Sequence, residues 1–156
     1  MADNQDNPGI RVPPPLIYLL PLVAGLALDR RFFHVPFLPR RLARPLGWAL
    51  FGSSWLVGGW FMRTIEKAGT PIRTDRPVPR LVTDGPFRFT RNPGYLGLAM
   101  LYAGIALLRN SLWAILLLPV VVYVIQREVI GREERYLERT FGEEYLAYKA
   151  RVRRWV

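Results

Sequence analysis

The chain has 156 residues, of which 51% are hydrophobic, yet its formal net charge at neutral pH is +10. Apolar residues grouped in blocks with arginines between them are typical of a membrane protein with basic loops. Cysteine is absent and histidine occurs once, at His34, which excludes disulfides, thiolate zinc sites and histidine-based metal clusters. No zinc finger, basic zipper or aromatic β platform accompanies the charge, so we expect the lipid bilayer rather than nucleic acid as its partner.

The first fifteen residues are predicted to be a disordered or extended lead-in. They are polar and end in Pro13-Pro14-Pro15, and proline runs favour extended backbone. A charged n-region is missing, so we do not expect a cleaved signal peptide. Residues 16–156 are expected to form a single domain, with His34 at a membrane interface rather than in a catalytic site.

Four apolar blocks follow, and they predict an all-α, polytopic membrane protein with about four transmembrane helices. Each block is shorter than the roughly 20 residues of an upright span, but flanking Trp, Tyr and Arg side chains can extend it by lying at headgroup level. The first block would also suit a re-entrant segment, and a soluble protein with buried core helices is the alternative. The blocks are Leu16 to Leu28, Pro45 to Met62, Tyr95 to Leu108, and Leu112 to Ile125.

The third and fourth blocks are predicted to form a helical hairpin, because only Arg109-Asn110-Ser111 separates them. Ser111 is placed to cap the fourth helix. The segment from Arg63 to Arg91 contains seven basic residues, these two included, and eight more follow Ile125. By the positive-inside rule, the middle loop and the C-terminal segment are therefore expected in the cytoplasm. The five arginines of the first loop weaken this orientation.

The end of the middle loop is predicted to open a helix at Asn92-Pro93, with Asn92 as the N-cap and Pro93 in the first turn. A helix N-terminus carries unpaired N–H groups and a partial positive charge, to which Arg88 and Arg91 add full charges. This arrangement suits a carboxylate or phosphate at the membrane surface. The alternative is a loop whose arginines reach phospholipid headgroups.

The acidic segment after the fourth block predicts a carboxylate on the inner face of that helix. Gln126, Ile130, Glu133 and Leu137 share one helical face, which places Glu133 on the stripe that continues the apolar helix. The alternative is a solvated, salt-bridged helix, since other acidic and basic residues there are four apart. In such a helix, Glu133 and Glu134 would form only surface salt bridges.

The last segment predicts a short amphipathic helix. Gly142 interrupts the preceding helix, and Tyr145, Tyr148 and Val152 then line one face of a basic segment. Such a helix either lies on the membrane surface or folds over the middle loop as a lid. We expect it to lie on the membrane surface.

An ordered set of motifs between Pro79 and Trp155 resembles the isoprenylcysteine carboxyl methyltransferases and the related phospholipid methyltransferases. These families are integral membrane enzymes that use S-adenosylmethionine. The set is far more specific than any one of its members. It consists of Gly85-Pro86-Phe87, then Arg91-Asn92-Pro93-Gly94-Tyr95-Leu96-Gly97, then Glu133-Glu134, then Phe141-Gly142-Glu143-Glu144-Tyr145 with Tyr148 and Arg151.

The resemblance implies an S-adenosylmethionine site built from the second half of the chain, roughly residues 79–155. The residues implied in catalysis are Arg91, Asn92, Tyr95 and Glu133. Those implied in cofactor binding are Pro79, Arg80, Leu81, Val82, Phe87, Asn92, Pro93, Gly94, Tyr95, Glu133 and Glu134. The helix N-terminus and arginines suit the carboxylate of the cofactor, Glu133 suits its ammonium or ribose hydroxyls, and Tyr95 suits the sulfonium.

Three positions depart from the pattern that the resemblance implies. Asn92 stands where the family often has histidine, and Asn does not titrate near neutral pH. Phe87 stands where the family often has tyrosine. Val129 stands where the carboxyl-esterifying members place a substrate-binding arginine, which argues against a prenylcysteine carboxylate as substrate.

The sequence therefore predicts an integral membrane methyltransferase, located in the cell inner membrane with its active site facing the cytoplasm. Its substrate is expected to be lipophilic or lipid-linked and to enter from the bilayer. Two alternatives remain open: an NADPH-dependent membrane reductase of the sterol reductase type, and a non-catalytic membrane subunit. Substrate identity and oligomeric state are left open.

Overall fold

The computed structural model describes residues 9, 12–32, 34–70 and 79–156, and all the regular structure in these ranges is helical. The predicted all-α class is therefore confirmed. In chain order the elements are α1 (Pro14–Arg31), α2 (Arg40–Lys67), the short 3₁₀ helix η1 (Gly85–Arg88), α3 (Pro93–Arg109), α4 (Leu112–Val124), the π-helical turn η2 (Ile125–Ile130), α5 (Gly131–Phe141) and α6 (Glu143–Arg151).

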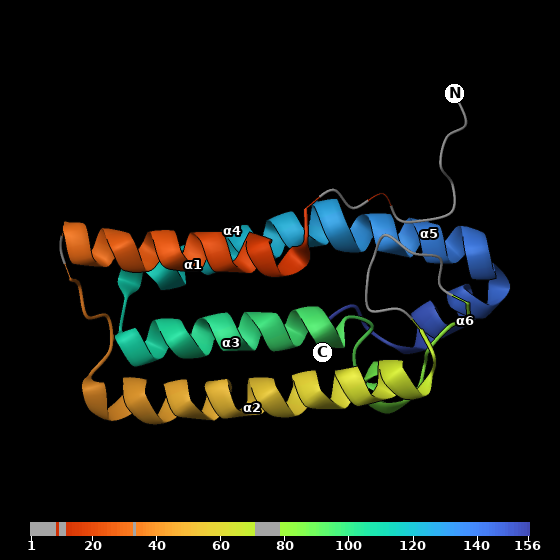
Figure 1. Ribbon diagram of the computed structural model, residues 1–156, viewed down its shortest axis with the longest axis horizontal. Helices are drawn as coiled ribbons and strands as arrows, with labels where there is room; N and C mark the ends of the chain where they lie inside the picture. Colours follow the sequence, from red (N-terminus) through yellow and green to blue (C-terminus); the bar gives the residue numbers. More distant parts are fainter. Residues whose placement is uncertain (1–8, 10–11, 33, 71–78) are drawn as a thin grey trace.

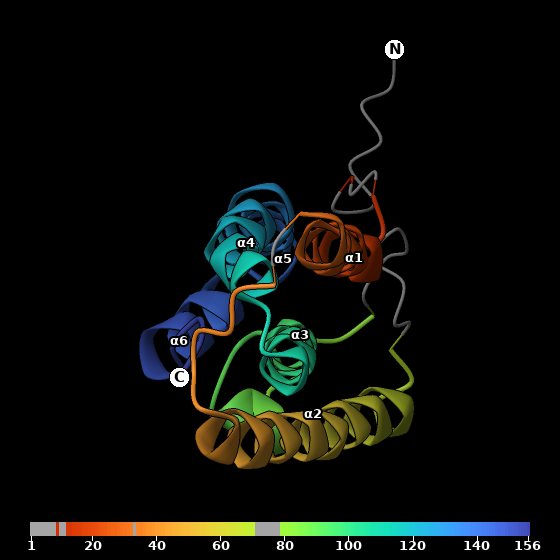
Figure 2. The ribbon, with the colours of Figure 1, turned by 90° about the vertical axis from the view of Figure 1, so that its left-hand side faces the viewer.

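Helix α3 lies at the centre of the bundle, between α2 on one side and the pair formed by α1 and α4 on the other (Figures 1 and 2). Its side chains Tyr102 and Ala106 are 1% and 0% exposed, and they belong to a core that also contains Ala114 and Ile125. The Tyr102 hydroxyl donates a hydrogen bond of 2.9 Å to the carbonyl of Ala114, which satisfies its polar atom inside this core.

Small residues allow the backbones of α2 and α3 to approach closely. A Cβ atom added at Gly104 of α3 would lie 2.8 Å from the backbone nitrogen of Phe51 in α2. Gly97, two turns earlier on α3, faces Gly58 of α2 in ordinary contact. Close backbone approach of this kind is how helices pack where a bilayer offers no hydrophobic drive between them.

The predicted hairpin between α3 and α4 is confirmed. Asn110 ends α3 in the left-handed region, with φ 50°, a conformation that Asn tolerates better than most residues. The Ser111 hydroxyl then accepts a hydrogen bond of 3.3 Å from the backbone N–H of Ala114, as an N-cap does.

Helices α4, η2 and α5 form one continuous helix from Leu112 to Phe141, and it is the one helix in the described ranges that is long and apolar enough to cross a membrane. The apolar part of α3, Pro93–Leu108, is shorter. The predicted count of about four transmembrane helices is not confirmed. Helix α1 ends in three consecutive charged residues, and the middle of α2 is rich in glycine and serine, so both have lower hydropathy than α4.

The N-terminal boundary differs from the predicted one. Helix α1 begins at Pro14, so Pro14 and Pro15 lie in its first turn instead of in the lead-in. Proline is tolerated there because the first N–H groups of a helix have no partner within it. The rest of the predicted lead-in falls largely on residues 1–8, 10 and 11, which lie outside the described residues.

Candidate active site

The N-terminus of α3 meets the first turn of α5 through a hydrogen bond between two of the predicted catalytic residues. The hydroxyl of Tyr95 donates to Oε1 of Glu133 at 2.6 Å, although the two residues are 38 positions apart. The Tyr18 hydroxyl of α1 donates to the backbone carbonyl of Tyr95 at 3.1 Å. Three helices thus fix the position of Tyr95, and its hydroxyl in turn orients the Glu133 carboxylate.

Glu134 lies between two arginines from distant parts of the chain. Its Oε1 accepts a hydrogen bond of 3.0 Å from Nε of Arg154, and its Oε2 accepts one of 2.6 Å from Nη2 of Arg154. Nη2 of Arg91 lies 3.3 Å from Oε1 of the same carboxylate. This hydrogen bonding raises the pKa of Arg154. Both oxygens of Glu134 therefore hold the C-terminal segment against the start of α3, and its predicted role as a cofactor ligand stays a prediction.

Arg91 is the most enclosed arginine of this cluster. Its side chain is only 9% exposed, and its Nε and Nη1 atoms are buried without a hydrogen-bond partner among the described residues. Buried donors are nearly always paired in folded proteins. The hydroxyl of Tyr145 also interacts with the Arg91 side chain. The guanidinium lies beside a helix N-terminus, where an anionic group is favoured, but its Nε and Nη1 atoms are covered by protein.

Asn92 occupies the N-cap position of α3, as predicted, but its side chain makes no capping hydrogen bond. Its Nδ2 instead donates to the backbone carbonyl of Arg154 at 2.9 Å. The hydroxyl of Thr90 donates to the same carbonyl at 3.0 Å, and the N–H of Arg91 donates to the carbonyl of Arg153. The prediction of a capping side chain was wrong: the carbonyl of Arg154 binds the amide nitrogen of Asn92, and in this orientation the side-chain oxygen accepts no bond from the first turn of α3.

Helix α6 packs on the protein, so the expectation that it lies on the membrane surface was wrong, and the lid alternative fits better. Tyr145 and Tyr148 are 1% and 4% exposed, and the Tyr148 hydroxyl donates to the carbonyl of Phe87 at 2.7 Å. Burial raises the pKa of Tyr145 to about 12 and also raises that of Tyr148. Both tyrosines therefore stay protonated near neutral pH and act as donors and packing groups.

The loop that precedes α3 carries the other predicted cofactor residues. Phe87 packs against Phe61 of α2, with ring centroids 5.8 Å apart, and Val82 is buried. Pro79 and Arg80 are exposed, and Leu81 is half-buried. Of the two residues between Asn92 and Tyr95, Pro93 is fully buried, and a Cβ at Gly94 would lie 3.2 Å from the Phe61 ring. As ligands of a cofactor these residues stay predictions.

Sequence reasoning missed Arg154 and the turn η2, and it named Tyr148 without the contact that Tyr148 makes here. Arg154 and Tyr148 reach the start of α3 by long-range contacts that have no periodic signal in the sequence. The π-helical turn η2 ends directly before α5 and shifts the helical register ahead of Glu133 and Glu134. Such turns occur often at functional sites. Glu128 and Arg132 do form the predicted surface pair, at 3.2 Å.

Comparison with known proteins decides the family. A family model described as phospholipid methyltransferase matches residues 42–144, about two thirds of the chain. The chain belongs to the phospholipid methyltransferase family. The match includes Arg91, Asn92, Tyr95, Glu133 and Glu134, but ends before Tyr145 and the C-terminal segment that carries Arg154. The resemblance noted in the sequence is thereby confirmed.

Several relatives match the chain. It is 33% identical over 72 residues to protein-S-isoprenylcysteine O-methyltransferase of Schizosaccharomyces pombe, covering 46% of this chain and 30% of that protein. It is 33% identical over 73 residues to protein-S-isoprenylcysteine O-methyltransferase B of Arabidopsis thaliana, covering 47% and 37%. An uncharacterized protein of Haemophilus influenzae is 40% identical over 62 residues, covering 40% of this chain and 98% of that protein.

The aligned segments therefore span less than two fifths of each of the two named methyltransferases. No solved structure matches the chain.

Proposed function

We propose that this protein is an integral membrane methyltransferase that transfers a methyl group from S-adenosylmethionine to a lipophilic or lipid-linked substrate. The observation that carries the proposal is the hydrogen bond between Tyr95 and Glu133, in a chain of the phospholipid methyltransferase family. It joins an aromatic hydroxyl to a carboxylate near the N-terminus of α3, and the next carboxylate along α5, Glu134, is paired with the guanidinium of Arg91.

The residues present fit the polar groups of the cofactor. The guanidinium of Arg91, whose Nε and Nη1 atoms have no hydrogen-bond partner among the described residues, suits the carboxylate of S-adenosylmethionine. The N-terminus of α3 adds unpaired N–H groups and a favourable dipole for the same anion. Glu133 has a second carboxylate oxygen beyond the one bonded to Tyr95, and this oxygen suits the ammonium or a ribose hydroxyl.

When bound, S-adenosylmethionine supplies a methyl group made electrophilic by its sulfonium. The protein contributes alignment and exclusion of water, which are the main sources of rate in an in-line transfer. Tyr95, held by Tyr18 and Glu133, places an aromatic face and a hydroxyl at one fixed position. Helix α6 and the segment after it cover this region, so they limit the access of water.

The surface of the bundle favours a substrate that arrives from lipid. Large apolar side chains on α2 and α4 are exposed, including Trp55 at 66%, Leu56 at 75% and Leu116 at 57%. Exposed apolar surface of this extent indicates contact with a membrane or partner. Val129, where the carboxyl-esterifying members have arginine, is 1% exposed in the core, which argues against a prenylcysteine carboxylate as the substrate.

In the proposed orientation, the protein lies in the cell inner membrane and its active site faces the cytoplasm. The segment before α3 and the C-terminal segment are hydrogen-bonded together, so the two most basic parts of the sequence lie at one end of the bundle. The positive-inside rule assigns that end to the cytoplasm.

The test is calorimetric titration of S-adenosylhomocysteine into the full chain purified in detergent. We expect micromolar binding, weakened about tenfold or more in Glu133→Gln, because that change removes a charge-assisted hydrogen bond to the ligand. The matched control is Glu128→Gln, which makes the same chemical change on an exposed carboxylate of the same continuous helix. Its affinity should stay within twofold.

Parallel titrations distinguish the alternatives. NADPH binding without S-adenosylhomocysteine binding would move the assignment to a membrane reductase. A folded protein that binds neither at millimolar concentration would indicate a non-catalytic subunit. Transfer of a labelled methyl group from S-adenosylmethionine into a lipid extract then identifies the substrate class.

A further inference from the structure

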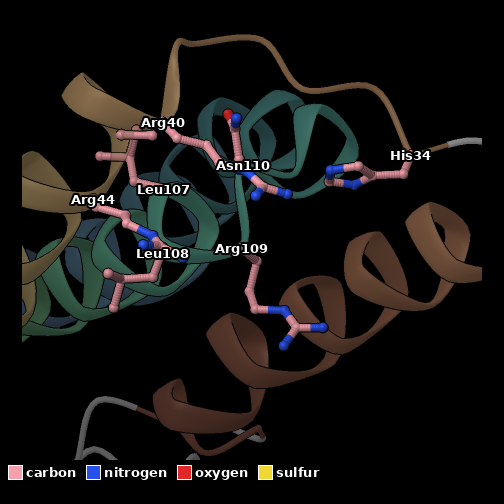
Figure 3. A pocket seen from close by; sticks show the side chains of 8 residues that line it. His34, Arg40, Arg44, Leu107, Leu108, Arg109 and Asn110 are labelled. Atoms are coloured by element: carbon pink, nitrogen blue, oxygen red, sulfur yellow. The ribbon is translucent and has the colours of Figure 1, made fainter.

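A second site candidate lies at the opposite end of the bundle, where the α1–α2 connection meets the α3–α4 turn. A pocket of about 150 Å³ opens there (Figure 3). None of its lining residues is acidic. They are His34, Arg40, Ala43, Arg44, Leu107, Leu108, Arg109 and Asn110, and we call this the arginine pocket.

The wall of the arginine pocket is fixed by Asn110. Its Oδ1 accepts a hydrogen bond of 3.2 Å from the N–H of Leu38, and its Nδ2 donates one of 2.7 Å to the carbonyl of Leu38. These two bonds tie the α1–α2 connection to the end of α3. The pocket is therefore held open by the fold, and ligand binding would cost little ordering of the backbone.

The three arginines of the pocket have no acidic partner among the residues that the structure describes. Within the described part of the chain, no ion pair or hydrogen bond involves the guanidinium groups of Arg40, Arg44 or Arg109. The acidic residue near this end, Asp29, is bonded instead to His34, at 2.6 Å. Three like charges around one small cavity repel each other, and an anion between them would relieve that repulsion.

The size and donors of the pocket indicate the chemistry of its ligand. It is smaller than the roughly 300–1,000 Å³ of typical small-molecule sites, so it suits one compact anionic group. Arginine forks match the oxygen geometry of phosphate and can bind it bidentately. Two of these arginines project from the first two turns of α2, whose N-terminal dipole also favours an anion.

The surroundings of the pocket favour a phosphate that belongs to a lipid. Leu42, Leu46 and Trp48 follow on α2 and are 48%, 51% and 61% exposed, so apolar surface for acyl chains adjoins the cationic groups. Tyr95 and Arg109 lie at opposite ends of α3, about 21 Å apart at 1.5 Å per residue. The ligand of the pocket is therefore distinct from the substrate of methyl transfer.

We propose that the arginine pocket binds a phosphate group through Arg40, Arg44 and Arg109, and that a phospholipid headgroup of the leaflet at that end supplies it. The proposal accounts for the first-loop arginines, which the positive-inside rule leaves unexplained. It goes beyond the proposed methyl transfer and does not depend on it.

The test titrates three probes into the full chain in a neutral detergent: dihexanoylphosphatidylglycerol, inorganic phosphate, and dihexanoylglycerol, which lacks the phosphate. We expect phosphatidylglycerol to bind, and Arg40→Gln and Arg109→Gln each to weaken its binding about tenfold, as loss of a charge-assisted hydrogen bond does. Arg41→Gln is the matched control, because it removes the same charge next to Arg40 but outside the pocket. It should change the affinity less than twofold.

Each outcome decides the proposal. Phosphatidylglycerol binding more tightly than inorganic phosphate, with loss only in the pocket variants, supports a lipid headgroup site. Equal binding of the two supports the phosphate chemistry but assigns it to free phosphate. The proposal is overturned if dihexanoylglycerol binds as tightly as phosphatidylglycerol, or if neither phosphate probe binds. It is also overturned if Arg41→Gln weakens phosphatidylglycerol binding as much as the pocket variants do. Thermal unfolding of each variant confirms that these exposed substitutions leave the fold intact, and S-adenosylhomocysteine binding should be unchanged.

Discussion

The two ends of α3 carry arginines in opposite circumstances. At its N-terminal end, Glu134 lies between Arg91 and Arg154, and the C-terminal segment is hydrogen-bonded to the residues that start the helix. At its C-terminal end, the arginines of the arginine pocket line one cavity and have no acidic partner among the described residues. The arginines at the N-terminal end of α3 are thus paired within the protein and stabilise its fold. Within the described part of the chain, those at the C-terminal end have their guanidinium groups free to bind an anionic ligand.

Solvent explains why both arrangements are stable. Arg40, Arg44 and Arg109 are exposed, so water and salt screen their mutual repulsion. Arg91 is nine-tenths buried and would be costly without Glu134 nearby. Substitutions at the first end should therefore affect folding most, while those in the arginine pocket should affect ligand binding.

The largest expected effect on stability comes from Glu134→Gln. It leaves the buried guanidinium of Arg91 without its counter-charge, and we expect a loss of about 3 kcal/mol in the free energy of unfolding. Chemical denaturation in detergent measures this value. Glu128→Gln removes a carboxylate from an exposed pair on the same continuous helix and should change stability by less than about 0.5 kcal/mol. Equal effects of the two variants would contradict the contrast between buried and exposed charge.

The next effect concerns Asn110→Ala at the other end. The change removes both hydrogen bonds to Leu38 and places alanine at φ 50°, so we expect a loss of about 2 kcal/mol. Asn110→Gly separates the two causes, because glycine adopts this φ freely and loses only the hydrogen bonds. A glycine variant as stable as the native protein would show that the Leu38 bonds contribute nothing.

The smallest effect is expected for Asn92→Ala, at about 1 kcal/mol, because one side-chain hydrogen bond to the Arg154 carbonyl is lost while Thr90 still donates to it. Hydrogen exchange should show faster exchange at the N–H of Arg91, which donates to the same C-terminal segment. Unchanged exchange there, together with a loss of helicity in α3, would indicate a capping role after all.

Local features were the part of the structure that could be predicted from the sequence. The α3–α4 hairpin, the cap at Ser111, the break at Gly142 and the Glu128–Arg132 pair each depend on residues within four positions of one another. Their signals are therefore contiguous in the chain. The family resemblance had the same basis, because its motifs are short runs in a fixed order.

Contacts between distant segments were not predictable in this way. The side chain of Asn92 could either accept a capping bond through its oxygen or donate through its amide nitrogen to another segment, and the position of the Arg154 carbonyl decided for donation. The placement of α6 was similar, since its amphipathic pattern suits a membrane surface and a protein surface equally. Burial of Tyr145 and Tyr148 decided it for the protein surface.

By itself, the sequence determined the all-helical class, the hairpin and the family, because helical periodicity, turn chemistry and ordered motifs are all local properties of the chain. Only the tertiary structure decided that Tyr95 bonds Glu133, that Glu134 is shared by two arginines, and that the arginines of the first loop gather with Arg109 around one pocket. These pairings join residues far apart in the chain, and packing of whole helices, rather than any local preference, brings their side chains together.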